Sequence, residues 1–253
     1  MVVLAVATVV LGGWSFVLFW AAAAIGVYWE WNAMVARHIK IPLLVGGAAM
    51  LAAAGTAGSG HFVYAVAAVA AGAIAVAVVA PRRRAWSAMG VLYAGVLVLA
   101  PVVLRRDRQY GMAAVLFLFA VVWATDILGY FVGRLVGGPK LAVHISPKKT
   151  WAGAFGGAVG AVVAGVGFMS MAGYAMGSPV STAFMLSIVS QGGDLLESAV
   201  KRRFGVKDAS RVIPGHGGLM DRLDGFLAAA GVAALIGIVR GGPDAAAQGL
   251  LLW

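Results

Sequence analysis

Residues 111–133 read GMAAVLFLFAVVWATDILGYFVG and contain one charged side chain, Asp126. A helix needs roughly 20 consecutive apolar residues to cross the hydrocarbon core of a bilayer, so this stretch predicts a transmembrane helix. Similar apolar runs cover about residues 2–29, 41–57, 62–80, 86–104, 151–173, 179–197 and 217–239. The first run is long enough for one tilted helix or for a hairpin broken near Gly12 and Gly13. We therefore expect an all-α, polytopic integral membrane protein with eight or nine transmembrane helices.

The composition agrees with this class. Hydrophobic residues make up 62% of the chain and charged residues 11%, whereas a soluble domain carries about 25% charged residues. The first run begins at Val2 with no basic segment before it, which predicts a span rather than a cleaved signal peptide. The absence of cysteine excludes disulfides, thiolate metal ligands and cysteine nucleophiles. Small residues within one run, Gly153, Gly156, Gly157 and Gly160, are spaced for close helix packing.

The formal net charge of +10 resides mainly in short loops between the apolar runs. Basic residues in such loops mark the cytoplasmic side of a membrane protein. By this rule the loops at residues 30–40, 81–85, 134–150 and 198–216 share the cytoplasmic face, whereas the Arg105–Arg108 loop falls on the opposite face. No basic stripe or soluble fold predicts nucleic-acid binding, so we expect no nucleic-acid partner.

Charged residues of both signs concentrate between residues 194 and 224. Membrane proteins retain such charges where they pair, bind ions or line a watery cavity. Five of the chain's 9 acidic residues lie here. The segment contains Asp194, Glu197, Lys201, Arg202, Arg203, Lys207, Asp208, Arg211, Asp221, Arg222 and Asp224.

Asp221 and Asp224 stand three residues apart at the start of the last apolar run. On a helix this spacing places both carboxylates on one face, where a bound cation would relieve their repulsion. Oxygen ligands without histidine or cysteine favour Mg²⁺, which commonly binds one or two carboxylates and substrate phosphates. Asp194 is a candidate third ligand from a neighbouring helix. The alternative is a salt bridge within the membrane, for instance from Arg222 to Asp194 or Asp221.

Two further segments are candidate phosphate sites. Pro214–Gly218 is a glycine-rich turn before a predicted helix, where backbone N–H groups can bind an anion, or it is only a loop. Residues 146–151, SPKKTW, offer two lysines beside hydroxyls to a phosphate, or they anchor the chain at the membrane surface. Asp126 is a candidate polar site residue inside its run, or it makes a helix–helix contact.

These polar segments resemble the phosphatidate cytidylyltransferase (CDP-diacylglycerol synthase) family. The family signature reads S-x-x-K-R, four residues, K-D, a spacer and P-x-H-G-G-x-x-D-R-x-D. SPKKTW at residues 146–151 and Asp126 with Tyr130 are similar to two other family stretches, although Ala152 stands where many relatives carry Glu. The signature is matched by Ser198, Lys201, Arg202, Lys207, Asp208, Pro214, His216, Gly217, Gly218, Asp221, Arg222 and Asp224.

The resemblance implies transfer of CMP from CTP to phosphatidate with release of pyrophosphate. It also implies a homodimer in the bacterial inner membrane, with the active site open to the cytoplasm. We expect one transmembrane domain over residues 1–253, with N-terminal helices over about 1–104 and a catalytic part over about 110–240.

The cofactor and the site residues follow from the charge cluster and the resemblance together. Mg²⁺ is expected on Asp194, Asp221 and Asp224, and the family implies a second, monovalent cation such as K⁺. Expected catalytic residues are Asp194, Lys201, His216, Asp221 and Asp224, with His216 as a positioning donor. Expected substrate- and phosphate-binding residues are Asp126, Ser146, Lys148, Lys149, Ser198, Arg202, Lys207, Asp208, Gly217, Gly218 and Arg222.

Three other activities match the sequence less well. Asp221–Gly225 superficially resembles a CDP-alcohol phosphotransferase motif, but that family needs D-G-x-x-A-R, and Phe226–Ala229 follows here. A CTP-dependent polyprenol kinase would lack the full signature. An ion-coupled transporter predicts inverted halves with broken helices, whereas these charges gather in the C-terminal half.

Overall fold

The computed structural model describes residues 2–37, 39–173, 178–210 and 217–252. These residues form helices and one short hairpin, so the all-α prediction is confirmed. The helices are α1 (Val2–Leu11), α2 (Gly13–Ala36), α3 (Lys40–Gly58), α4 (Phe62–Val79), α5 (Arg84–Arg106), α6 (Gly111–Val136), α7 (Trp151–Met171), α8 (Pro179–Arg203), α9 (Met220–Gly241) and α10 (Ala246–Leu251), and the strands are β1 (Lys140–Ala142) and β2 (Ser146–Thr150).

Several helices are suited to a bilayer, and the protein is an integral membrane protein. Within the described residues, six helices are long and apolar enough to cross a membrane: α3, α4, α5, α6, α7 and α9. Helices α2 and α8 are 24 and 25 residues long but do not meet that measure of apolarity. The predicted count of eight or nine spans is therefore not confirmed.

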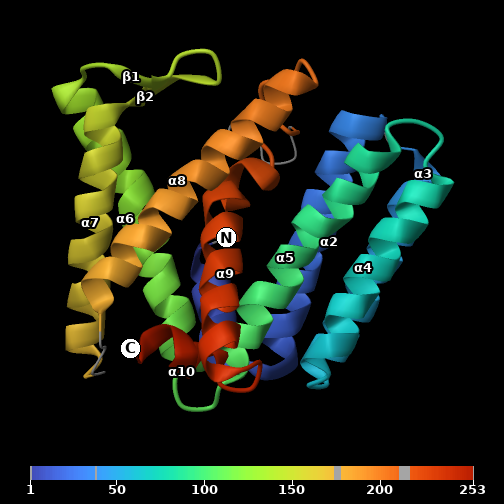
Figure 1. Ribbon diagram of the computed structural model, residues 1–253, viewed down its shortest axis with the longest axis horizontal. Coiled ribbons are helices and arrows are strands. Elements are labelled where there is room, and N and C mark those ends of the chain that lie inside the picture. Colours follow the sequence, from blue (N-terminus) through green and yellow to red (C-terminus); the bar gives the residue numbers. More distant parts are fainter. Residues whose placement is uncertain (1, 38, 174–177, 211–216, 253) are drawn as a thin grey trace.

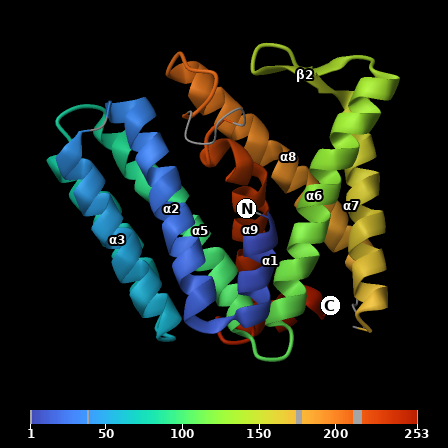
Figure 2. The ribbon, with the colours of Figure 1, turned by 180° about the vertical axis from the view of Figure 1, so that it is seen from behind.

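The first apolar run is a hairpin rather than one tilted helix. Gly12 and Gly13 take positive φ angles of 63° and 54° between α1 and α2, a conformation that glycine adopts without steric cost. Helix α1 turns back beside α2 and lies between α2 and α6 (Figure 2). Helix α2 then continues to Ala36, into the segment 30–40 that the sequence analysis assigned to a loop.

The helices form two groups joined by α9. Helices α2 to α5 lie on one side, α6 and α7 lie on the other, and α8 crosses the bundle obliquely (Figure 1). The connections α2–α3, α4–α5 and α6–α7 and the end of α8 all lie at one end of the bundle (Figures 1 and 2). This arrangement brings the loops that the positive-inside rule assigned to one face together.

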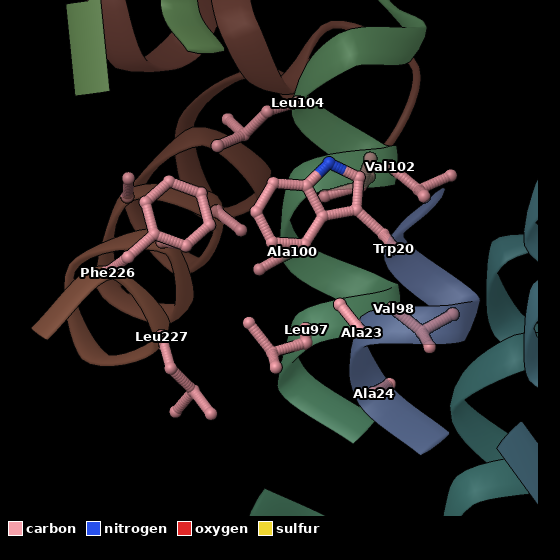
Figure 3. Packing of buried hydrophobic residues seen from close by; sticks show 14 of the residues in the cluster. Trp20, Ala23, Ala24, Leu97, Val98, Ala100, Val102, Leu104, Phe226 and Leu227 are labelled. Carbon is pink, nitrogen blue, oxygen red and sulfur yellow. The ribbon is translucent and has the colours of Figure 1, made fainter. Parts of the chain in front are cut away.

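An aromatic core ties α9 to the N-terminal helices. Trp20 of α2 is 1% exposed and stacks on Phe226 of α9, with ring centroids 4.8 Å apart and an interplanar angle of 14°. Leu97, Val98 and Leu104 of α5 belong to the same buried cluster (Figure 3). Burial of such large aromatic side chains is a main source of packing energy, so α2 and α5 position α9.

Helices α6 and α7 pack through glycines, as the sequence predicted. A Cβ atom on Gly157 would lie 2.7 Å from the carbonyl oxygen of Thr125, and one on Gly153 would lie 2.7 Å from that of Gly129. Cβ atoms on Gly156 and Gly160 would collide with side chains of α6. Small residues at such a crossing let two membrane helices approach closely.

The segment 134–150, assigned to a loop from the sequence, contains strands β1 and β2, and α7 begins at Trp151, where the predicted apolar run begins. Strand β2 pairs antiparallel with β1, with Lys140 opposite Thr150 and Ala142 opposite Ser146. The strand stops at Thr150 because its hydroxyl caps α7, accepting the N–H of Gly153 at 3.1 Å. The hairpin thereby holds the two lysines above α6 and α7.

The arginines that violated the positive-inside rule have backbone partners at the opposite end of the bundle. Arg105 Nε donates to the carbonyl oxygen of Val9 at 2.8 Å. Arg106 donates to the carbonyl oxygen of Gly60 and pairs with Asp244 at 3.4 Å. Arg105 and Arg106 therefore bind carbonyl oxygens near the ends of α1 and α3.

Substitution of Gly157 by Ala is expected to destabilise the protein by about 1–3 kcal/mol, because the added methyl group meets backbone on α6. The measurement is thermal unfolding in detergent. Gly167→Ala on the same helix is the matched control, since nothing lies within 4 Å of a Cβ atom there. Equal melting temperatures for the two variants would contradict close packing at Gly157.

Candidate active site

A cavity of about 870 Å³ lies between α6, the β hairpin, α7, α8 and α9. It contains charged residues from three separate stretches of the sequence: the middle of α6, the SPKKTW segment and the acidic segment. Electrostatic interactions strengthen where water is partly excluded. The predicted site residues that line the cavity are Asp126, Lys148, Lys149, Asp194, Lys201, Asp221, Arg222 and Asp224.

Lys201 lies between two carboxylates of the acidic segment, Glu197 and Asp221. Its Nζ atom lies 2.6 Å from Oε2 of Glu197 and 2.5 Å from Oδ1 of Asp221. The Glu197 side chain is 0% exposed, and those of Lys201 and Asp221 are each 12% exposed. Because an unpaired charge is costly at such a site, Lys201 holds α8 against the start of α9.

Asp221 also organises the backbone around it. Its Oδ2 atom accepts the N–H of Gly218 at 2.7 Å and the N–H of Ala209 at 3.1 Å. One carboxylate thus receives a lysine and two backbone donors. The sequence analysis predicted Asp221 as a metal ligand, and the structure shows that this carboxylate joins Ala209 to Gly218.

The remaining carboxylates gather around Lys149. The Nζ atom of Lys149 lies 2.5 Å from Oδ2 of Asp194, and the Ser198 hydroxyl donates to the same carboxylate at 3.4 Å. Asp224 accepts the N–H of Gly225 at 2.7 Å. It interacts electrostatically with Asp194, Asp126 and Lys149. A lysine of the β hairpin therefore faces acids from three helices.

The donors suit a hard cation, but they are not gathered into a finished metal site. Carboxylate oxygens from Asp126, Asp194, Asp221 and Asp224 line one cavity, and Mg²⁺ prefers such ligands. Across residues 2–37, 39–173, 178–210 and 217–252, no three His, Cys, Asp or Glu side chains form a group placed to hold a metal ion. Asp194 pairs with Lys149 and Asp221 pairs with Lys201, so Mg²⁺ binding stays a prediction.

The other predicted residues that the structure describes are not among those that line the cavity. Arg202 Nε donates to the carbonyl oxygen of Ile145 at 3.5 Å and joins α8 to the hairpin. Lys207 and Asp208 are exposed. His216 lies outside the described residues. Ser146 starts β2, Ser198 reaches the site through Asp194, and Gly217 and Gly218 lead into α9.

The sequence analysis gave no role to several residues that contact or line the cavity. Glu197 was counted in the acidic segment without a role, although its spacing of four residues from Lys201 indicates a helical ion pair. Gln191 and Arg134 also line the cavity, and Arg134 donates to the hydroxyl of Tyr130 at 2.9 Å. A further buried carboxylate, Glu30, is 1% exposed and directly follows the predicted apolar run 2–29.

An apolar slot of about 440 Å³ adjoins the charged cavity. Aromatic side chains from α2, α6 and α9 dominate its walls, and its two charged lining residues, Asp126 and Arg222, line the charged cavity as well. Such a pair of cavities fits a molecule with one charged and one hydrocarbon end. The slot is lined by Val2, Ala5, Phe19, Trp20, Phe119, Val122, Trp123, Asp126, Arg222, Leu223 and Phe226.

The chain is similar to bacterial proteins named phosphatidate cytidylyltransferase. The chain is 43% identical over 244 residues to a phosphatidate cytidylyltransferase of Brucella abortus, covering 92% of this chain and 88% of the relative. Proteins of the same name are 41% identical over 151 residues in Haemophilus influenzae, covering 57% of this chain and 52% of the relative, and 41% identical over 130 residues in Bacillus subtilis, covering 49% and 47%. A model of the cytidylyltransferase family matches residues 1–239. The chain belongs to the cytidylyltransferase family.

Proposed function

We propose that this protein is a phosphatidate cytidylyltransferase, which transfers CMP from CTP to phosphatidate and releases pyrophosphate. The observation that carries the proposal is the charged cavity joined to an apolar slot through Asp126 and Arg222. Phosphatidate has a phosphate head and hydrocarbon chains, so it matches both chambers. The cytidylyltransferase family and the relatives named phosphatidate cytidylyltransferase support the same activity.

In the reaction, a phosphate oxygen of phosphatidate attacks the α-phosphorus of CTP. A new P–O bond forms, the bond from the α-phosphorus to the bridging oxygen breaks, and pyrophosphate leaves with that electron pair. Both reactants are anionic, so positioning and charge neutralisation supply most of the catalysis. Lys148, Lys149 and Arg222 line the cavity and would neutralise the phosphates, with Lys149 changing partner from Asp194 to substrate.

Mg²⁺ is the proposed cofactor, and Asp194, Asp221 and Asp224 would hold it. The cation would supply positive charge to the triphosphate. Support comes from the hard oxygen donors that these side chains contribute to one cavity. A second, monovalent cation such as K⁺ is part of the same proposal. His216 would position a phosphate as a hydrogen-bond donor, because a phosphate monoester nucleophile needs no general base.

The same proposal includes a location and an assembly. The protein would lie in a bacterial inner membrane as a homodimer, with the cavity open to the cytoplasm, where CTP is found. The basic loops at the cavity end of the bundle support this orientation under the positive-inside rule.

Substitution of Asp224 by Asn is expected to lower kcat by at least about 100-fold while the protein stays folded, because a proposed carboxylate ligand of the Mg²⁺ ion that would neutralise the triphosphate is lost. The measurement is pyrophosphate release from CTP and phosphatidate with Mg²⁺ in detergent. Asp244→Asn serves as the control, since that side chain is 82% exposed and pairs with Arg106 at the opposite end.

Two results would count against the proposal. Normal turnover by Asp224→Asn would remove Asp224 from the site. Absence of pyrophosphate release by the unmodified protein at every Mg²⁺ concentration would overturn the proposed activity itself.

Replacement of Lys149 by Gln is expected to lower kcat/KM for phosphatidate by about 10- to 100-fold. A hydrogen bond to a charged group contributes about 1.5–3 kcal/mol, which corresponds to that range. Lys149→Arg keeps the charge and should retain part of the activity. Lys40→Gln, at the exposed start of α3, is the control. Loss of the same size in the control would show that overall basic charge, and not Lys149, matters.

A further inference from the structure

A carboxylate outside the cavity holds the start of the helix that carries the acidic residues. Glu30 lies on α2 and is 1% exposed. Its Oε1 atom accepts the N–H of Leu219 at 2.8 Å and the hydroxyl of Ser210 at 2.6 Å, and its Oε2 atom accepts the N–H of Met220 at 2.6 Å. Three donors on one buried carboxylate form a strong, charge-assisted contact.

Glu30 supplies the N-terminal cap that α9 lacks. The first N–H groups of a helix have no partner within the helix, and the N-cap residue of α9, Leu219, offers no side-chain acceptor. A negative charge at this end also interacts favourably with the helix dipole. The cap comes from a helix 190 residues earlier in the chain, so it joins the N-terminal helices to α9.

Glycines on both sides make room for this contact. A Cβ atom on Gly218 would lie 2.8 Å from both carboxylate oxygens of Glu30. A Cβ atom on Gly26, one turn earlier on α2, would lie 2.7 Å from a methyl carbon of Leu219. The face of α2 and the start of α9 therefore fit each other closely.

Two carboxylates, Glu30 and Asp221, bind residues on either side of positions 211–216. Glu30 binds Ser210 on one side and Leu219 and Met220 on the other. Asp221 does the same within the C-terminal part of the chain, because it binds the N–H groups of Ala209 and Gly218. Asp221 also pairs with Lys201, so these contacts connect the start of α9 to α8 as well.

We propose that Glu30 is a positioning residue for the cytidylyl transfer, acting through α9. It sets the axial position and rotation of the first turn of α9, and hence the directions in which Asp221, Arg222 and Asp224 meet the cavity. Glu30 itself lies outside the cavity lining and touches no substrate. The catalytic consequence of this inference rests on the proposed function. The contact of Glu30 with the start of α9 can be measured without substrate, by hydrogen–deuterium exchange.

The test is Glu30→Gln in the full-length protein, in detergent. The side chain keeps its size, but an NH₂ group replaces one acceptor and opposes a backbone N–H. We expect kcat to fall by about 10- to 100-fold, as for outer residues that orient ligands, with KM for CTP changed less than threefold. Hydrogen–deuterium exchange over residues 218–224 should accelerate at least about tenfold, while exchange in α6 stays unchanged.

Asp107→Asn is the matched control. Asp107 is also buried, and its carboxylate accepts the N–H groups of Gln109, Tyr110 and Gln248 at the opposite end of the bundle. It should lower thermal stability without changing kcat of the folded fraction. Equal loss of kcat in the two variants at matched stability, or unchanged exchange over residues 218–224 in Glu30→Gln, would overturn the positioning role.

Ser210→Ala decides the question if Glu30→Gln does not fold. It removes one of the three donors and leaves the carboxylate in place. We expect a two- to tenfold fall in kcat, which matches the loss of about one ordinary hydrogen bond, and faster exchange over residues 218–224. Unchanged kcat and exchange would overturn the proposal. If Ser210→Ala shows faster exchange but the unmodified protein has no cytidylyltransferase activity, the positioning of α9 by Glu30 stands and the proposed function is contradicted.

Discussion

The structure of the site depends on the ion pairs of Lys201 with Glu197 and Asp221. Removing one partner from a buried ion pair costs about 3–5 kcal/mol, because the other charge is left uncompensated. Two buried carboxylates on adjacent helices therefore require the lysine between them. Their attraction holds the end of α8 against the start of α9, and every other acid of the cavity takes its place from these two helices or from α6.

The parts of the fold that were predictable from the sequence are those that depend on the apolar interior of the bilayer. Long apolar runs identify membrane helices because a span must cross the hydrocarbon core. The glycines from Gly153 to Gly160 indicated close helix packing, and the structure shows that α6 is the partner. The site was predictable for a related reason, since charges are expensive among apolar residues. Among the charged residues that stood out, those that line one cavity are Asp126, Lys148, Lys149, Asp194, Lys201, Asp221, Arg222 and Asp224.

Pairing between distant segments was not predictable from the sequence. The contact of Lys149 with Asp194 joins a strand to α8, and no local spacing encodes it. The short strand β2 was missed because a run of five residues that includes Pro147 gives almost no periodic signal. Glu30 was overlooked because it follows a long apolar run, and its burial depends on how α2 packs against α9.

The carboxylates of this protein divide into two groups by what satisfies them. Glu30, Glu197 and Asp221 have lysine or backbone partners that hold helices together. Asp126, Asp194 and Asp224 line one cavity, in which Asp194 pairs with Lys149 of the β hairpin. Under the proposed function, the fixed pairs would keep the geometry while Lys149 moves from Asp194 to an anionic substrate. Lysine and Mg²⁺ would compete for the same carboxylate oxygens, and carboxylate and phosphate would compete for the same lysine.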